Sequence, residues 1–154
     1  MSGLSSLSKL IERVVLFRLS SHVADFNLLS PSQSAYRTNY STETALLSIQ
    51  NDLLVAADAG LGSALLLLDL SAAFDTVDHR ILIERMATAF GVSGSALNWF
   101  RSYLFGRTQS VKALGVTSFP VPLPFGFPQE SVLGPCLFNI YTSPVNRHCC
   151  CPRG

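Results

Sequence analysis

Residues 63–79 have the sequence SALLLLDLSAAFDTVDH, and this stretch decides the predicted fold. Its run of consecutive leucines carries no charge and is followed by polar residues, a pattern typical of a short strand covered on both faces. Asp69 comes directly after that run, so its carboxylate is expected at the carboxyl end of the strand, where ligand sites of α/β sheets lie. A single acidic residue after an apolar run is also common without any function.

Apolar residues at helical spacing predict a helix on either side of a polar loop that precedes this strand. The first helix is expected over about 4–21. Its predicted packing face contains Leu7, Leu10, Ile11, Val14 and Phe17, with Lys9, Glu12 and Arg13 on the opposite face. The second helix is expected over 42–58, with Ser41 as its N-cap, Glu43 in its first turn and Gly60 after its end.

The sequence after the strand predicts two more helices, a hairpin and a final helix. Asp78 is expected to cap a helix that ends at Gly91, and Ser93 or Ser95 to begin another that ends at Gly106. Residues 108–114 and 119–123 form a predicted hairpin, and 131–141 a short apolar helix. The predicted fold class is therefore mixed α/β, with helices packed on a small, incomplete sheet.

Composition limits the classes of protein to consider. The chain has 154 residues, 48% of them hydrophobic and 14% charged, which excludes a disordered chain and suggests apolar surface that meets neighbours. A net charge of +1 provides no strong field for nucleic acid. No secretory signal and no 18-residue apolar run is present, so the expected location is intracellular, in the cytoplasm or nucleus, without a membrane span.

Three of the four cysteines are adjacent, at 149–151. Adjacent cysteines do not make a disulfide framework. A metal site with His148 is disfavoured, because neighbouring side chains rarely converge on one ion without a second pair of ligands. The pattern therefore favours a reduced chain with an unusual tail.

Several segments together resemble the reverse transcriptases of non-LTR (LINE-type) retrotransposons. LLLLDLSAAFDTVDH at 65–79 is similar to their A motif, and GFPQESVLGPCLFNIY at 126–141 to their B motif. Residues 95–111 resemble the connecting segment, and residues 7–23 and 28–47 resemble the fingers. The resemblance implies a partial reverse transcriptase domain over 1–143, with fingers at 1–61 and part of the palm at 62–143. The divergent tail at 144–154 is expected to be disordered.

The A motif resemblance implies a role for each of its first residues. Asp69 would be the catalytic, Mg²⁺-binding aspartate, with the backbone carbonyl of Leu70 beside it. Ala72 and Ala73 would offer backbone N–H groups to the triphosphate of the incoming nucleotide. Phe74 would lie under the sugar, where a bulky ring excludes a 2′-hydroxyl and so selects deoxynucleotides.

The B motif and the fingers supply the remaining predicted contacts. Gln129 would lie near the nucleotide and the template strand, and Ser131 would begin the following helix as its cap. Arg37 would contact template phosphate. The partners implied for the parent enzyme are an RNA template, a DNA primer, a deoxynucleoside triphosphate and Mg²⁺.

The sequence also departs from the family pattern. Glu130 stands where the family has Gly, which is expected to weaken nucleotide binding, because Gly permits conformations that a side chain forbids. The Tyr-Ala-Asp-Asp run of the C motif is absent, and no Asp or Glu follows Glu130. We therefore expect a polymerase fragment that binds Mg²⁺ poorly and is inactive alone. The alternatives are a co-opted nucleic-acid or protein-binding remnant and a non-functional product of a decayed element.

Overall fold

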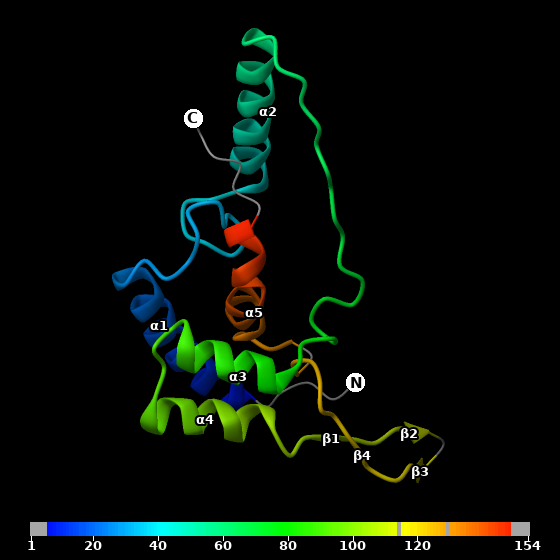
Figure 1. Cartoon of the computed structure of the whole chain (residues 1–154). Helices are drawn as coiled ribbons and strands as arrows, with labels where there is room; N and C mark the ends of the chain where they lie inside the picture. Colours follow the sequence, from blue (N-terminus) through cyan, green and yellow to red (C-terminus); the bar gives the residue numbers. More distant parts are fainter. Residues whose placement is uncertain (1–5, 114, 129, 149–154) are drawn as a thin grey trace.

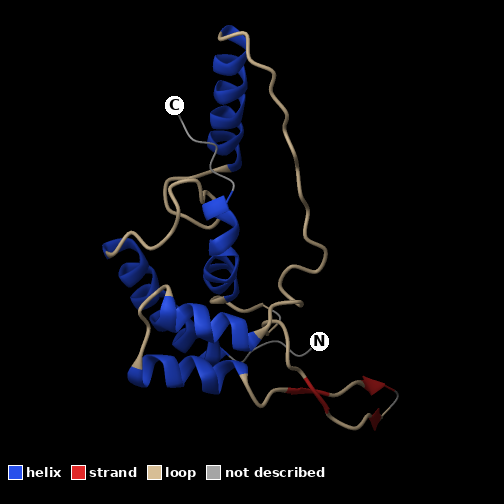
Figure 2. Ribbon diagram, in the orientation of Figure 1, coloured by secondary structure: helices blue, strands red, loops and turns tan. Residues whose placement is uncertain are grey.

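The computed structural model describes residues 6–113, 115–128 and 130–148, and its elements confirm the mixed α/β class (Figures 1 and 2). The described helices are α1 (Ser6–Asp25), α2 (Thr42–Asp58), α3 (His79–Thr88), α4 (Gly94–Leu104) and α5 (Gly134–His148). The described strands are β1 (Thr108–Gln109), β2 (Lys112–Ala113), β3 (Val116–Thr117) and β4 (Val121–Pro122). None of these helices has the length and apolar composition needed to cross a membrane.

The core lies where α3 packs against α4 and α5, and the second half of α1 covers it. Its largest fully buried apolar side chains are Leu82, Met86, Phe90, Leu104, Leu133, Leu137 and Ile140. Leu19 and Val23 from α1 complete the cluster. Helices far apart in the sequence therefore enclose one apolar centre, and the site described below lies at its edge.

The predicted starts of α2, α3 and α4 are confirmed, whereas α5 begins at Gly134, three residues later than predicted. Ser41 forms a capping box with Thr44 at the start of α2. Asp78 accepts hydrogen bonds from the backbone N–H groups of Arg80 (2.7 Å) and Ile81 (3.3 Å) at the start of α3. Ser93 precedes α4 but makes no side-chain cap hydrogen bond.

The predicted packing face of α1 is wrong, because Leu7, Leu10, Ile11, Val14 and Phe17 are all exposed. The buried side of the helix instead contains Glu12, Leu19 and Val23, with Val15 and Leu16 partly buried. These residues also follow helical spacing, so periodicity alone allowed either face. Glu12 is buried because Tyr103 of α4 and the segment just before α5 supply hydrogen-bond donors for it.

The buried strand predicted at 63–70 is also wrong. The segment forms no strand and connects α2 to the turn before α3 as an extended chain (Figure 1). Leu66, Leu67 and Leu68 are each 79% exposed, and α2 has no buried residue. A strand needs neighbours for its backbone groups and for both apolar faces, and the described residues provide none for this segment.

The predicted hairpin is confirmed as a narrow ribbon that extends away from the helices (Figure 2). At its base β1 pairs antiparallel with β4, placing Thr108 opposite Pro122, and at its tip β2 pairs with β3, placing Lys112 opposite Thr117.

The final helix is longer than expected. It continues through Pro144 to His148, whereas the sequence predicted an irregular tail from 144. Cys149, Cys150 and Cys151 lie outside the described residues.

Candidate functional site

The segments that resemble the A and B motifs lie side by side, joined by backbone hydrogen bonds. The N–H of Phe127 donates to the carbonyl of Phe74 (3.1 Å), and the N–H of Gly126 donates to the carbonyl of Val77 (2.9 Å). Asp78 and Phe125 form an antiparallel bridge next to them. Two stretches about fifty residues apart in the sequence thus form one structural unit.

Gly126 makes this close approach possible. Its φ is +78°, and a Cβ added there would lie 2.9 Å from both the Cα and the carbonyl oxygen of Asp75. The carbonyl of Gly126 accepts from the buried His79 Nε2 (2.7 Å) and from Arg107 Nη1 (3.3 Å). His79, which the sequence left without a catalytic role, therefore anchors the turn that brings the two motifs together.

A pocket of about 370 Å³ lies at this junction. Its walls are formed by Tyr36, Phe74, Asp75, Phe127, Pro128, Glu130, Ser131, Gly134 and Pro135. Phe74 is 36% exposed, and its ring packs 5.2 Å from that of Phe138 and 6.3 Å from that of Phe127, measured between centroids. The structure therefore brings two predicted site residues, Phe74 and Ser131, to the same pocket.

Ser131 also belongs to a hydrogen-bond network behind the pocket wall. Its Oγ accepts from the N–H of Gly134, the first residue of α5 (3.0 Å), although the helix begins three residues after Ser131. The same oxygen lies 2.8 Å from the Tyr103 hydroxyl and 3.1 Å from the Glu12 carboxylate. Burial raises the pKa of the Tyr103 hydroxyl well above its ordinary value. Ser131 is thus fixed by internal partners on its inner side.

Glu130 lines the pocket with its backbone in the left-handed region, at φ +60°. Its carboxylate pairs with the Lys9 ammonium of α1 at 2.6 Å. The hydrogen bond and charge of Lys9 lower the pKa of the Glu130 carboxyl. A glycine, which the family pattern has at this position, adopts such a backbone without strain.

The residues predicted to bind metal and phosphate, Asp69, Ala72 and Ala73, do not form a metal site in the described part of the chain. Asp69 is exposed, and its Oδ1 accepts from the N–H of Leu70 (2.9 Å). Ala72 lies in an exposed turn at φ +51°, and its carbonyl accepts from the N–H of Asp75, while Ala73 is half-buried in the same turn. Across the described residues, no three His, Cys, Asp or Glu side chains converge as metal ligands would. The present donor set therefore does not fit a two-Mg²⁺ centre.

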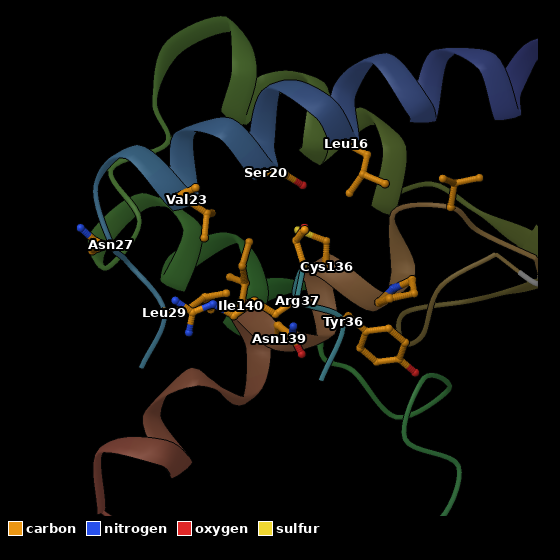
Figure 3. A pocket seen from close by; sticks show the side chains of 14 residues that line it. Leu16, Ser20, Val23, Asn27, Leu29, Tyr36, Arg37, Cys136, Asn139 and Ile140 are labelled. Atoms are coloured by element: carbon orange, nitrogen blue, oxygen red, sulfur yellow. The ribbon is translucent and has the colours of Figure 1, made fainter. Parts of the chain in front are cut away.

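Arg37 lies in the loop between α1 and α2, beside a second pocket of about 480 Å³ under α1 (Figure 3). Its guanidinium donates to the carbonyls of Ser30 (3.4 Å) and Gln33 (3.5 Å) and lies over the ring of Tyr40. These contacts show that Arg37 organises its own loop. Gln129, predicted to approach the nucleotide, lies outside the described residues.

Sequence reasoning missed Glu12 and Tyr103, which support the pocket from behind. Each is one of several polar residues in its helix, so no local pattern distinguished them. Gly126 carried a weak signal, since it lies in the Pro/Gly-rich loop.

The junction of two polymerase-like motifs around one pocket defines the class of protein, and comparison with known proteins agrees with it. The family model described as reverse transcriptase (RNA-dependent DNA polymerase) matches residues 1–150. The chain belongs to this family.

Its relatives include proteins of transposable elements. The chain is 32% identical over 142 residues to the probable RNA-directed DNA polymerase from transposon BS of Drosophila melanogaster. It is 31% identical, also over 142 residues, to the RNA-directed DNA polymerase from mobile element jockey of Drosophila funebris. These matches cover 92% of this chain but only 16% and 15% of the two relatives. The chain thus spans about one sixth of the length of the curated relatives it matches.

Proposed function

We propose that this chain is the nucleotide-facing part of an RNA-directed DNA polymerase of a non-LTR retrotransposon. The observation that carries this proposal is the pocket of about 370 Å³ between Phe74 and Ser131, the two motif residues predicted to face the nucleotide. In this proposal the partners of the complete enzyme are an RNA template, a DNA primer and a deoxynucleoside triphosphate, and its location is intracellular.

Phe74 would discriminate between sugars. Its ring is partly exposed to the pocket and is supported by the neighbouring rings of Phe127 and Phe138. A supported ring cannot move aside easily, so a ribose 2′-hydroxyl pressed against it would clash or lose its water without gaining a partner. Ala72, Ala73 and Gln129 would contact the nucleotide, and Arg37 the template phosphate.

Asp69, with the Leu70 carbonyl beside it, would contribute to binding the Mg²⁺ ions that support the family's phosphoryl-transfer chemistry. One carboxylate cannot hold two ions in place for an in-line displacement. Among the described residues, Asp69 belongs to no group of three or more His, Cys, Asp or Glu side chains that could hold a metal ion. We propose that these 154 residues alone do not polymerise DNA.

Sugar selection is tested by equilibrium binding of dTTP and the matched ribonucleotide, 5-methyluridine triphosphate, to the purified chain. We expect tighter binding of dTTP and loss of that preference in Phe74→Ala. Phe119→Ala is the matched control, because Phe119 is 92% exposed and does not line the pocket. Equal preference in wild type and Phe74→Ala would refute the assignment of Phe74.

The absence of polymerisation is tested by primer extension on a primed RNA template with dNTPs and Mg²⁺. We expect no extension by the purified chain. Extension that disappears in Asp69→Ala would show that the chain holds a complete catalytic site, contrary to the proposal.

A further inference from the structure

We infer that Glu12 is a positioning residue. Its buried carboxylate holds Ser131 and the following backbone in place, and Ser131 forms part of the pocket wall. This inference rests on the proposed function only in taking that pocket as the nucleotide site. The placement of the wall by Glu12 stands on hydrogen bonds that are independent of any ligand.

The Glu12 carboxylate joins three elements that are distant in sequence. It is 2% exposed, and its Oε2 accepts from the backbone N–H groups of Val132 (2.7 Å) and Leu133 (3.2 Å), just before α5. Ser131 Oγ lies 3.1 Å from the same oxygen. On the other side, the Tyr103 hydroxyl of α4 donates to Oε1 (3.1 Å).

The first N–H groups of a helix have no acceptor within the helix, and they carry partial positive charge. Leu133 is fully buried, so without Glu12 its N–H would have neither water nor a protein acceptor nearby. No cation among the described residues pairs with this carboxylate. The backbone N–H groups just before α5 and the Tyr103 hydroxyl therefore compensate its charge, and the carboxylate connects these two segments.

This arrangement has a consequence for the pocket. Ser131 and Gly134 form part of its wall, and both are connected to Glu12, directly or through the Ser131 hydroxyl. Because Glu12 is on α1, the segment that resembles the fingers fixes the position of the segment that resembles the B motif. The negative charge of Glu12 also occupies the anion-binding end of α5. A triphosphate in this pocket would therefore point away from the start of α5.

The chain contains its own reporter of this network. Trp99 is the single tryptophan, and its ring stacks on that of Tyr103 at 5.3 Å between centroids and 9° between planes. Excitation at the red edge of tryptophan absorption therefore reports selectively on the ring next to the Glu12 cluster. Tyr103→Phe keeps this stacking and removes one hydrogen bond to Glu12.

The test compares Glu12→Ala, Glu12→Gln and Tyr103→Phe, with Glu84→Ala as the control, because Glu84 is an exposed carboxylate on α3. Three quantities are measured on the full chain. They are Trp99 emission, the exchange rates of the Val132 and Leu133 amide protons, and dATP affinity. For Glu12→Ala we expect shifted emission, faster exchange at both amides and a loss of dATP affinity of about tenfold or more, since small misplacements of a binding wall are costly.

Glu12→Gln retains one oxygen acceptor, so we expect Trp99 emission and amide exchange close to wild type. If Glu12→Ala does not fold, Tyr103→Phe decides the question, because it removes one hydrogen bond to Glu12 and should cause smaller changes of emission, exchange and dATP affinity in the same direction. The inference would be overturned if the Glu12 and Tyr103 variants matched Glu84→Ala in Trp99 emission, amide exchange and dATP affinity. A wild-type chain that does not bind dATP would refute the proposed function, while emission and exchange would still decide the role of Glu12.

Discussion

Gly126→Ala tests the contact between the two motifs most directly. Gly126 has φ +78°, and an added Cβ would lie 2.9 Å from two backbone atoms of Asp75. The alanine would first have to adopt a left-handed conformation, which costs about 1–2 kcal/mol. It would also press against backbone atoms, which no change of side-chain rotamer relieves.

Relief of that clash requires the two segments to separate. Separation breaks the hydrogen bonds from Gly126 N to Val77 O and from Phe127 N to Phe74 O. Each contributes about 1 kcal/mol. We therefore expect Gly126→Ala to lower the free energy of unfolding by about 3–4 kcal/mol in total.

Gly91→Ala is the matched control. Gly91 has φ +65°, but an added Cβ there would meet no atom within 4 Å. Its expected loss is about 1–2 kcal/mol, from the backbone conformation alone. Urea unfolding followed by Trp99 fluorescence and circular dichroism measures both variants. Equal losses would show that Gly126 is not needed for the close approach of the motifs.

Three further predictions concern other parts of the chain. Asp78→Ala should lower the free energy of unfolding by about 1 kcal/mol, measured by thermal denaturation. Ser93→Ala should lower it by less, because Asp78 makes cap hydrogen bonds and Ser93 makes none. Equal losses in the two variants would contradict this prediction. Glu130→Gly should be more stable than Glu130→Gln, since both variants lose the ion pair with Lys9 but only glycine suits φ +60°. A higher free energy of unfolding for Glu130→Gln in urea would contradict backbone strain at this position. Leu67→Lys should change the free energy of unfolding by no more than about 0.5 kcal/mol in urea, because Leu67 is exposed. Leu82→Lys should prevent folding, because Leu82 is fully buried. A large loss of stability in Leu67→Lys would mean that Leu67 is packed against other residues.

Local signals made the helices predictable from the sequence. Ser41 and Asp78 are short polar residues before apolar periodic stretches, and both cap helices through contacts within three residues. Gly91 and Gly106 follow helix ends with positive φ. Such features depend on neighbouring residues alone, so one sequence is enough to find them.

The errors arose where the outcome depends on distant partners. The leucines at 65–68 have the composition of a buried strand, but a strand also needs partners that periodicity cannot supply. In α1, two faces have helical spacing, and hydrogen bonds from Tyr103 and Val132 decide that Glu12 lies on the buried one. Phe74 and Ser131, which the motif resemblance predicts near the nucleotide, line one pocket, and their roles stay predictions. Asp69 belongs to no group of three or more potential metal ligands in the described part of the chain.

The exposed connection at 61–70 has a consequence for the covalent continuity of the protein. Exposed connections outside helices and strands are where proteolytic cleavage concentrates. A cut there would divide the polypeptide into an amino-terminal piece with α1 and a carboxyl-terminal piece with α3, α4 and α5. The apolar packing of Leu19 and Val23 and the buried Glu12 would still hold α1 in the second piece. We therefore expect the two pieces to stay associated after the cut, the behaviour on which split-protein reconstitution relies.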